Sequence, residues 1–333
     1  MYSLDSISSI GSQLQRPECV LTTSNERTYC SNWDGGVTVI ESDGQQYSIL
    51  ANNLDFRLKP NGICLLEDGS FLIAHLGEEE GGVYQLFPDG TAQAFLTHLD
   101  NKRIPPTNFV HLDYQGRIWI TVSTKTIPRA AAYRSDVQDG FIILYDKGEA
   151  RIVADNLGYT NECLVSEDGN FLYVNETFSR RLSRFDISEK GDLSNKVTLT
   201  HFDKGVFPDG LVKDAAGYFW VTSIVSNQII RVAPDGKEQA TQLIDVDKDH
   251  LDWVETAFLS HSMGRPHLDQ VKSQKLKNIS SLAFGGPDRN TIFLGCLLGH
   301  QISKFKQNHT GLAPSHWLFN GPNKTLVQPE NKK

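Results

Sequence analysis

A phrase of about fourteen residues recurs four times in this chain and constrains the fold more than any other feature. Each copy begins with Asn or Asp, continues through an apolar run and a turn, and ends in a second apolar or aromatic run. The copies start at residues 59, 106, 159 and 207 and are KPNGICLLEDGSFL, PTNFVHLDYQGRIW, YTNECLVSEDGNFLY and FPDGLVKDAAGYFW. A glycine stands eight positions after the leading Asn or Asp in every copy. This spacing predicts a strand, a tight turn and a second strand, repeated without slippage.

A third apolar segment follows each hairpin, and two fainter copies bring the number of units to six. The leading residues of the units lie 43 to 71 positions apart and are Glu18, Asn61, Asn108, Asn161, Asp209 and Ser280. Repeats of this length without an accompanying helix are typical of propeller blades. We therefore predict an all-β fold in which residues 1–333 form a single six-bladed β-propeller. A pair of β-sandwiches with similar hairpins is the alternative.

Two stretches interrupt the regular spacing, residues 123–139 inside unit three and residues 245–278 before unit six. We expect both to be loops over one face, the second with a short helix. Two segments could supply the strand that closes the last blade, YSLDSISSI at 2–10 and APSHWLFNG at 313–321. We expect the second, because it is strand-like and directly follows unit six. The tail at 323–333 is expected to be disordered.

Composition excludes several classes of protein. The formal net charge is −8 and no cluster of Lys and Arg occurs, which argues against nucleic acid or an anionic membrane as a partner. The apolar runs are too short to span a bilayer, and the N-terminus lacks the features of a secretory signal. Five scattered cysteines without a C-x-x-C pair indicate buried reduced thiols rather than a disulfide framework. We expect a cytoplasmic protein; its oligomeric state stays open.

The leading residues of the six units should meet, because the innermost strand of each propeller blade lines the central tunnel. All six carry oxygen donors. The carboxylates of Glu18 and Asp209 would repel each other in a half-buried tunnel, and a divalent cation would relieve that repulsion. Carboxylate and amide oxygens suit a hard ion such as Ca²⁺. The pattern thus predicts a metal site at one mouth of the tunnel, and the alternative is that these residues only shape turns.

Three motifs in separate units resemble one family of six-bladed propellers. RPECV, YTNECLVSEDG and FPDGLVKDAAGYFWVTS are similar to motifs of the senescence marker protein, regucalcin and gluconolactonase family, and the resemblance spans about residues 16 to 305. It implies a divalent ion held by Glu18, Asn161 and Asp209, with Asn108 near the ion and the substrate. It also implies hydrolysis of sugar lactones; relatives cleave phosphotriester-like substrates. Ca²⁺ is the expected ion, with Zn²⁺, Mn²⁺ and Mg²⁺ as alternatives.

The chain departs from the family's pattern in unit three. The place of the family's arginine holds Pro106, and Phe109 and Val110 occupy the places of an Asp-Gly pair. This loss weakens the expectation that the substrate is gluconolactone itself. Arg103, a few residues upstream, is the candidate replacement, and an ordinary solvated loop arginine is the alternative. The segment VNETFSRRLSRFDI at 174–187 also resembles strictosidine-synthase-like propellers.

The resemblance and the strand pattern together suggest roles for individual residues. Asp209 would act as general base or as nucleophile, two roles that sequence does not separate, and Asn108 would stabilise the oxyanion. Further substrate contacts are expected from Asn61 at the mouth and from His75 and Glu176 at the ends of second strands. Unit three and its insertion would add Arg103, Arg129, Tyr133 and Arg134. The insertion would act as a lid that binds a carboxylate or phosphate; a plain surface loop is the alternative.

The preferred hypothesis is a metal-dependent hydrolase that opens a small-molecule lactone by attack of activated water on the ester carbonyl. Two alternatives remain, a phosphotriester-type hydrolase with the same site and a non-catalytic propeller that binds Ca²⁺ or a partner. Motifs of other chemistries, such as G-x-S-x-G, H-E-x-x-H and the phosphate-binding loop, do not occur. The sequence does not name the lactone.

Overall fold

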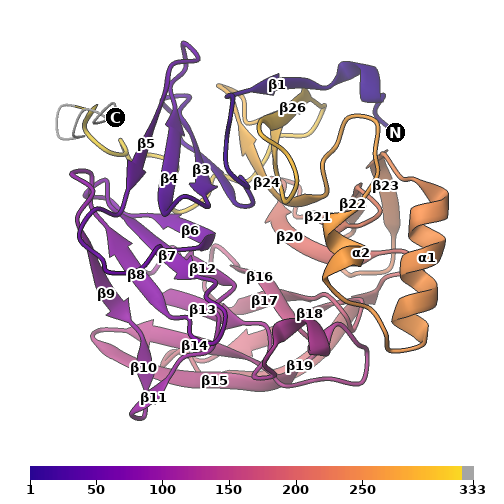
Figure 1. The fold of residues 1–333 in the computed structure, drawn as a ribbon, viewed down its shortest axis with the longest axis horizontal. Helices are drawn as coiled ribbons and strands as arrows, with labels where there is room; N and C mark the ends of the chain where they lie inside the picture. The colour runs from indigo at the N-terminus through magenta and orange to yellow at the C-terminus, as the bar shows by residue number, and fades with distance from the viewer. Residues whose placement is uncertain (325–333) are drawn as a thin grey trace.

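Six four-stranded antiparallel sheets surround a central axis in the computed structural model, which describes residues 1–324 (Figure 1). The arrangement is the all-β six-bladed propeller that the repeats predict. Part of the tail that was expected to be disordered, residues 325–333, lies outside the described residues. No helix among residues 1–324 has both the length and the apolar character needed to cross a membrane.

Blades one to three take their strands from consecutive segments. The strands of the first blade are β2 (Val20–Thr22), β3 (Thr28–Asn32), β4 (Gly36–Ile40) and β5 (Gln46–Leu50). Those of the second are β6 (Pro60–Leu65), β7 (Phe71–His75), β8 (Val83–Leu86) and β9 (Ala92–Leu96). Those of the third are β12 (Phe109–Leu112), β13 (Ile118–Val122), β14 (Gly140–Asp146) and β15 (Glu149–Leu157). A small hairpin, β10 (His98–Leu99) and β11 (Lys102–Arg103), separates blades two and three.

Blades four and five follow the same plan, and blade six joins the two ends of the chain. The fourth contains β16 (Thr160–Val165), β17 (Phe171–Glu176), β18 (Arg181–Ile187) and β19 (Leu193–His201). The fifth contains β20 (Phe207–Lys213), β21 (Phe219–Ile224), β22 (Gln228–Val232) and β23 (Gln239–Ile244). The sixth contains β24 (Ile279–Gly285), β25 (Thr291–Cys296), β26 (Ile302–Lys306) and the N-terminal β1 (Ser8–Ile10).

The recurring glycine has a conformational cause. In all four clear copies this glycine, eight residues after the leading Asn or Asp, closes the hairpin turn with φ between +73° and +87°. Its amide donates to the carbonyl three residues earlier, for example Gly217 to Asp214 at 2.9 Å. A residue with a Cβ is disfavoured in this left-handed region, so the glycine repeats wherever the turn repeats.

Six of the seven apolar clusters in the described residues lie between neighbouring blades, one at each interface. The cluster between blades three and four, for instance, joins Trp119 and Ile142 to Leu172 and Val174. Equivalent clusters fill the other five interfaces. Because each blade packs both faces against its neighbours, its inner strands are buried at most positions, whereas outer strands such as β19 are largely exposed. All five cysteines are buried and free, as expected from their spacing.

The expectation for the closing strand is wrong. β1 pairs with β26 in antiparallel register, Ser8 with Lys304 and Ile10 with Ile302. The segment at 313–321 forms no strand and instead covers one end of the tunnel, where the Ser315 hydroxyl donates to the carbonyl of Leu112 at 2.6 Å. Pro314 has no N–H to donate to a ladder, which disfavours this segment as a strand.

Both insertions lie over one face, on a shared apolar cluster. The first contains the short 3-10 helix η2 (Arg129–Ala132), and the second contains α1 (Lys248–Leu259) and α2 (Arg265–Asp269), which lie at the side of blade five in Figure 1. Another short 3-10 helix, η1 (Leu4–Ser6), precedes β1. Tyr133 of the first insertion and Phe258 and Leu268 of the second belong to one buried cluster with residues of blades four and five. The insertions therefore support each other.

Candidate functional site

The six leading residues meet in one small cavity of about 10 Å³ at the centre of the propeller. Each comes from a different blade, and each is buried, with exposed fractions of 1% to 7%. The members of this group, which we call the mouth residues, are Glu18, Asn61, Asn108, Asn161, Asp209 and Ser280. The convergence predicted from the repeats is therefore present.

A break in strand pairing aims these side chains inward. In blades two, four, five and six the register of the inner strand shifts around the leading residue, for example between Pro208 and Leu211. A bulge of this kind takes a residue out of the regular alternation and redirects its side chain. At Gly210, inside one bulge, an added Cβ would lie 2.6 Å from the carbonyl oxygen of Ser280 in the next blade. The Gly after Asp209 thus permits close packing of neighbouring blades.

Hydrogen bonds hold several mouth residues in place. The Asn61 amide donates to the carbonyl of Asn108 at 3.0 Å, and the Ser280 hydroxyl donates to the carbonyl of Glu18 at 2.9 Å. The amide nitrogen of Asn161 donates to the Thr177 hydroxyl at 3.2 Å, which leaves its amide oxygen available. Asn108 Oδ1 is buried without a hydrogen-bond partner. Unpaired buried oxygens are costly unless a ligand or water satisfies them.

The cavity gathers acidic side chains whose ionisation burial opposes. Burial, followed by the nearby charges of Glu18 and Glu162, raises the pKa of Asp209 well above its ordinary value, while Arg16 and Arg129 oppose the shift. Burial also raises the pKa of Glu162 to about 8, although a hydrogen bond from the Leu211 amide favours the ionised form. Sequence reasoning passed over Glu162, which directly follows Asn161 and lines the same cavity. The fold thus places three acidic side chains around one small buried space.

The donor set fits a hard divalent cation. It offers carboxylate and amide oxygens, an unpartnered Asn108 oxygen and a local excess of acidic groups, all of which favour such an ion. Within residues 1–324, however, no group of three or more His, Cys, Asp or Glu side chains is arranged to hold a metal ion. A site here would therefore depend on asparagine oxygens as well as carboxylates.

Arg16 connects this cavity to a larger cleft. Its Nη1 lies 2.6 Å from Glu18 Oε2, the distance of an ion pair but without hydrogen-bond geometry, and donates to Asn61 Oδ1 at 3.3 Å. Its guanidinium also stacks over the Trp33 ring, 4.2 Å from the centroid. The sequence analysis did not single out Arg16. Its only signal was its position two residues before Glu18 in the RPECV motif.

The cleft has a volume of about 650 Å³, and its walls come from blades one and two and from both insertions. Two of the predicted substrate contacts, Arg129 and Tyr133, line it. The lining also includes Arg16, Trp33, Lys59 and Arg265.

Four predicted substrate contacts lie elsewhere. Arg103 pairs with Glu80 and Arg134 with Asp136 at 2.7 Å, both in exposed positions where solvent competes for the side chains. His75 lies below the cleft wall, where Nδ1 accepts from the Lys59 amide at 3.0 Å and burial lowers the pKa to about 4. Glu176 is fully buried among hydrogen-bond donors of blade four.

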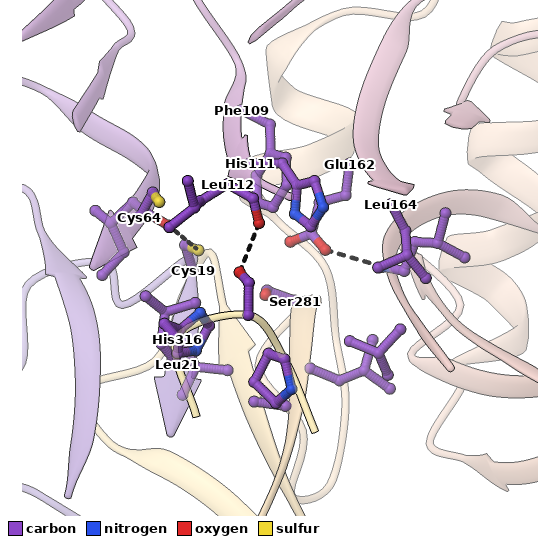
Figure 2. A pocket seen from close by; sticks show the side chains of 18 of the residues that line it. Cys19, Leu21, Cys64, Phe109, His111, Leu112, Glu162, Leu164, Ser281 and His316 are labelled. Atoms are coloured by element: carbon purple, nitrogen blue, oxygen red, sulfur yellow. Dashed lines mark hydrogen bonds between the residues drawn. The ribbon is translucent and has the colours of Figure 1, made fainter. Parts of the chain in front are cut away.

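The tunnel continues beyond the mouth as a second, mostly apolar cavity of about 100 Å³ (Figure 2). Cys19 and Glu162 line both cavities, and the segment around His316 covers the far end. Figure 2 shows the labelled side chains that line this space, among them His111 and His316, whose pKa values burial lowers to about 4. The neutral rings and buried thiols give this part of the tunnel little charge.

Comparison with known proteins gives a family match over more than half of the chain. Residues 59–248 match the SMP-30/Gluconolactonase/LRE-like region. A 6-deoxy-6-sulfogluconolactonase from Pseudomonas putida is 27% identical over 180 residues, 52% of this chain and 57% of that protein. A regucalcin from Xenopus laevis is 29% identical over 141 residues, 41% of this chain and 46% of that protein. The chain spans about half the length of the curated relatives that it matches.

Solved structures share the fold at low sequence identity. A gluconolactonase from Xanthomonas campestris has a TM-score of 0.65 and 16% identity, covering 90% of this chain and 89% of that one. A calcium-binding regucalcin from Agrobacterium tumefaciens has a TM-score of 0.65 at 16% identity, and the match covers 93% of this chain and 95% of that one. A luciferin-regenerating enzyme has a TM-score of 0.66 at 15% identity, and the match covers 93% of this chain and 98% of that one.

Proposed function

Because the chain belongs to the SMP-30/gluconolactonase/LRE-like family, we propose that it is a metal-dependent hydrolase that opens a sugar-type lactone. The convergence of the mouth residues carries the proposal. Six oxygen-bearing side chains from six blades surround one small cavity, and a cleft opens beside it. A propeller that served only as a scaffold would gain nothing from acidic groups directed into its own tunnel.

Glu18, Asn161 and Asp209 would hold the ion, with Asn108 and Asn61 beside it. Ca²⁺ suits the all-oxygen donor set best, and Zn²⁺, Mn²⁺ and Mg²⁺ are the alternatives to be separated by experiment. When bound, such an ion polarises an ester carbonyl and lowers the pKa of a coordinated water. It would also offset the repulsion that raises the pKa of Asp209 in the free protein.

The chain's own side chains would then carry the proton transfers. A water oxygen forms a bond to the lactone carbonyl carbon while the Asp209 carboxylate accepts the water proton. The Asn108 amide donates a hydrogen bond to the carbonyl oxygen as it becomes negative. The ring C–O bond then breaks, and the ring oxygen takes up the proton and becomes a hydroxyl, so that the product is an open hydroxy acid.

The cleft would bind the rest of the substrate. Trp33 and Tyr133 offer flat walls for a sugar ring, and Arg129 offers hydrogen bonds from its guanidinium. We do not retain Arg103, Arg134, His75 and Glu176 as substrate contacts, because each is engaged with other partners outside the cleft lining.

The test is hydrolysis of a panel of γ- and δ-lactones by chelator-treated protein, with each divalent ion added back singly. We expect one ion to restore turnover. Asp209→Asn and Glu18→Gln should each lower kcat by at least about 100-fold, because each removes a carboxylate ligand of the ion. Asp209→Asn also removes the proposed general base. Ser12→Ala, on an exposed turn, should leave activity unchanged.

Two other outcomes would redirect the assignment. Turnover of phosphotriesters but not lactones would identify the same site as a phosphotriesterase. Ca²⁺ binding without turnover of either substrate class would identify a calcium-binding propeller and contradict the proposal.

A further inference from the structure

The cleft beside the mouth is cationic, although the chain as a whole is acidic. Four cationic side chains line it, Arg16, Lys59, Arg129 and Arg265, against two carboxylates, Glu78 and Glu79. Both carboxylates lie on the exposed rim, whereas Arg16, Lys59 and Arg129 are partly buried. The chain has a formal net charge of −8, so this excess of positive charge is local to the cleft.

Three of these cations have acidic partners, and one does not. Arg16 pairs with Glu18, Lys59 with the exposed Glu78 and Arg265 with Asp269. No carboxylate within residues 1–324 lies within 4.0 Å of the Arg129 guanidinium.

The contacts of Arg129 hold the side chain in position and leave it able to bind a ligand. Its Nη2 donates to the Ser123 hydroxyl at 3.3 Å, and its guanidinium lies over the Tyr159 ring, 5.5 Å from the centroid. Its Nε is buried without a hydrogen-bond partner. A partly buried guanidinium without a counter-ion favours an anionic ligand, because arginine presents several donors in a rigid fork.

A second donor group lines the same cleft. Arg265, at the start of α2, donates from Nη1 to the Tyr133 hydroxyl at 3.5 Å. Arg129 and Arg265 come from different insertions, and the two insertions share one apolar cluster. The cleft thus presents cationic donors from two independent segments of the chain.

We infer that the substrate carries an anionic substituent, a phosphate, sulfonate or carboxylate, which Arg129 binds with the help of Arg265. The inference rests on the proposed lactonase function. Arg16 already contacts Glu18 and Asn61, so Arg129 and Arg265, and not Arg16, would bind the anionic group. Arg129 is therefore a residue that determines which lactone is accepted.

Kinetics with matched substrates test this assignment. A neutral aldono-δ-lactone is compared with counterparts that carry phosphate, sulfonate or carboxylate at the carbon farthest from the carbonyl, at one ionic strength. We expect kcat/KM to be at least about 10-fold higher for an anionic lactone than for the neutral one. Whichever of the three anions is preferred identifies the group.

Variants separate recognition from stability. Arg129→Gln should lower the anionic-to-neutral ratio of kcat/KM by about 10- to 100-fold. Arg129→Lys should give an intermediate ratio, because it keeps the charge and loses the fork. Arg265→Gln should give a smaller loss. Arg134→Gln, in the same insertion but paired with Asp136 outside the cleft, is the matched control and should behave like the wild type.

Binding measurements distinguish failure of this inference from failure of the proposed function. The lactam analogues of the same compounds resist hydrolysis, so their Kd can be measured by calorimetry whether or not any lactone turns over. Tighter binding of the anionic lactams, lost in Arg129→Gln, supports the inference even if catalysis is absent. Equal binding of neutral and anionic lactams, or an equal loss of both in Arg129→Gln, would overturn it.

Discussion

Glu176 has a different role from the one that its position on a second strand suggested, which was contact with the substrate. Its carboxylate accepts hydrogen bonds from the Gly158 amide at 2.6 Å and the Ser183 hydroxyl at 2.5 Å. It also pairs with Arg181 at 2.6 Å and Lys196 at 2.9 Å. Every oxygen is satisfied within blade four, so Glu176 stabilises the blade and does not face the substrate.

The stability of the protein should depend on pH through this carboxylate. Burial opposes its ionisation, but the bonds from Arg181, Lys196, Gly158 and Ser183 outweigh burial and lower the pKa of Glu176 below its ordinary value of 4.5. Its contribution is therefore complete above about pH 4.5 and is lost as the pH falls through the folded-state pKa.

The substitution Glu176→Gln should lower the free energy of unfolding by about 3 kcal/mol at pH 7, because it leaves two partly buried cations without their partner. The deficit should shrink as the pH falls below about 4.5 and through the lower folded-state pKa, where the wild-type carboxylate becomes protonated. Urea unfolding of both proteins across this range measures the effect. Parallel pH profiles of the two proteins would show that the carboxylate does not act in this way.

Within single structural elements, a hydrogen bond between an aspartate and a tryptophan stabilises two of the hairpins. Asp214 Oδ2 accepts from Trp220 Nε1 at 3.0 Å, and Asp113 Oδ2 accepts from Trp119 Nε1 at 2.9 Å. In both hairpins the tryptophan follows the aspartate by six positions. In the two copies with a leucine at the tryptophan place, Leu72 and Leu172, the residue six positions earlier is not an aspartate, and leucine has no N–H that needs an acceptor.

The substitution Asp214→Ala should destabilise blade five strongly. Besides Trp220, the carboxylate accepts from Arg231 and from the amides of Ala216 and Tyr218, and its side chain is 1% exposed. We expect a loss of about 3 kcal/mol or more in the free energy of unfolding, since a buried indole N–H and a guanidinium lose their acceptor.

The matched control is Asp68→Ala, in the corresponding turn of blade two. Asp68 accepts only from the amide and hydroxyl of Ser70, so the loss should be about 1 kcal/mol. Both values come from urea unfolding at pH 7. Equal losses would mean that the turn itself, and not the buried network, determines hairpin stability.

Closure of the ring is a property of the whole molecule. Contacts between successive inner strands run from β2 through β24 and back to β2, and β1 completes blade six. Ile7 packs against the cluster between blades five and six, and Ile10 against the cluster between blades six and one. The N-terminal segment therefore ties the last blade to its two neighbours.

The double substitution Ile7→Asp with Ile10→Asp should weaken this closure. Two apolar side chains that are partly buried would be replaced by charges, at a cost of about 3 kcal/mol in total. Ser8→Asp with Ser9→Asp adds the same charge to exposed positions of the same segment and is the control. Thermal unfolding should show a lower Tm for the isoleucine pair alone. A similar fall in both variants would indicate that charge, not lost packing, is responsible.

Local patterns were enough to predict much of this protein. The period-two strands, the turn glycine eight residues after each leading residue, and the repetition itself predict six blades and the convergence of oxygen donors at one mouth. Each of these features depends on residues a few positions apart, and propeller geometry then relates one unit to the next. The choice of Glu18, Asn161 and Asp209 as metal ligands remains a prediction that came from the family resemblance.

Other features depended on residues that are distant in sequence, and only the tertiary structure decided them. It selected β1 over the segment at 313–321 to close the ring, and it brought Arg16, Arg129 and Arg265 to one cleft from positions up to 249 residues apart. The tertiary structure also surrounds the Glu176 carboxylate with hydrogen-bond donors and cations of blade four. The physical reason is that a side chain's partner depends on which surfaces meet when the ring closes, and a local pattern contains no information about that contact.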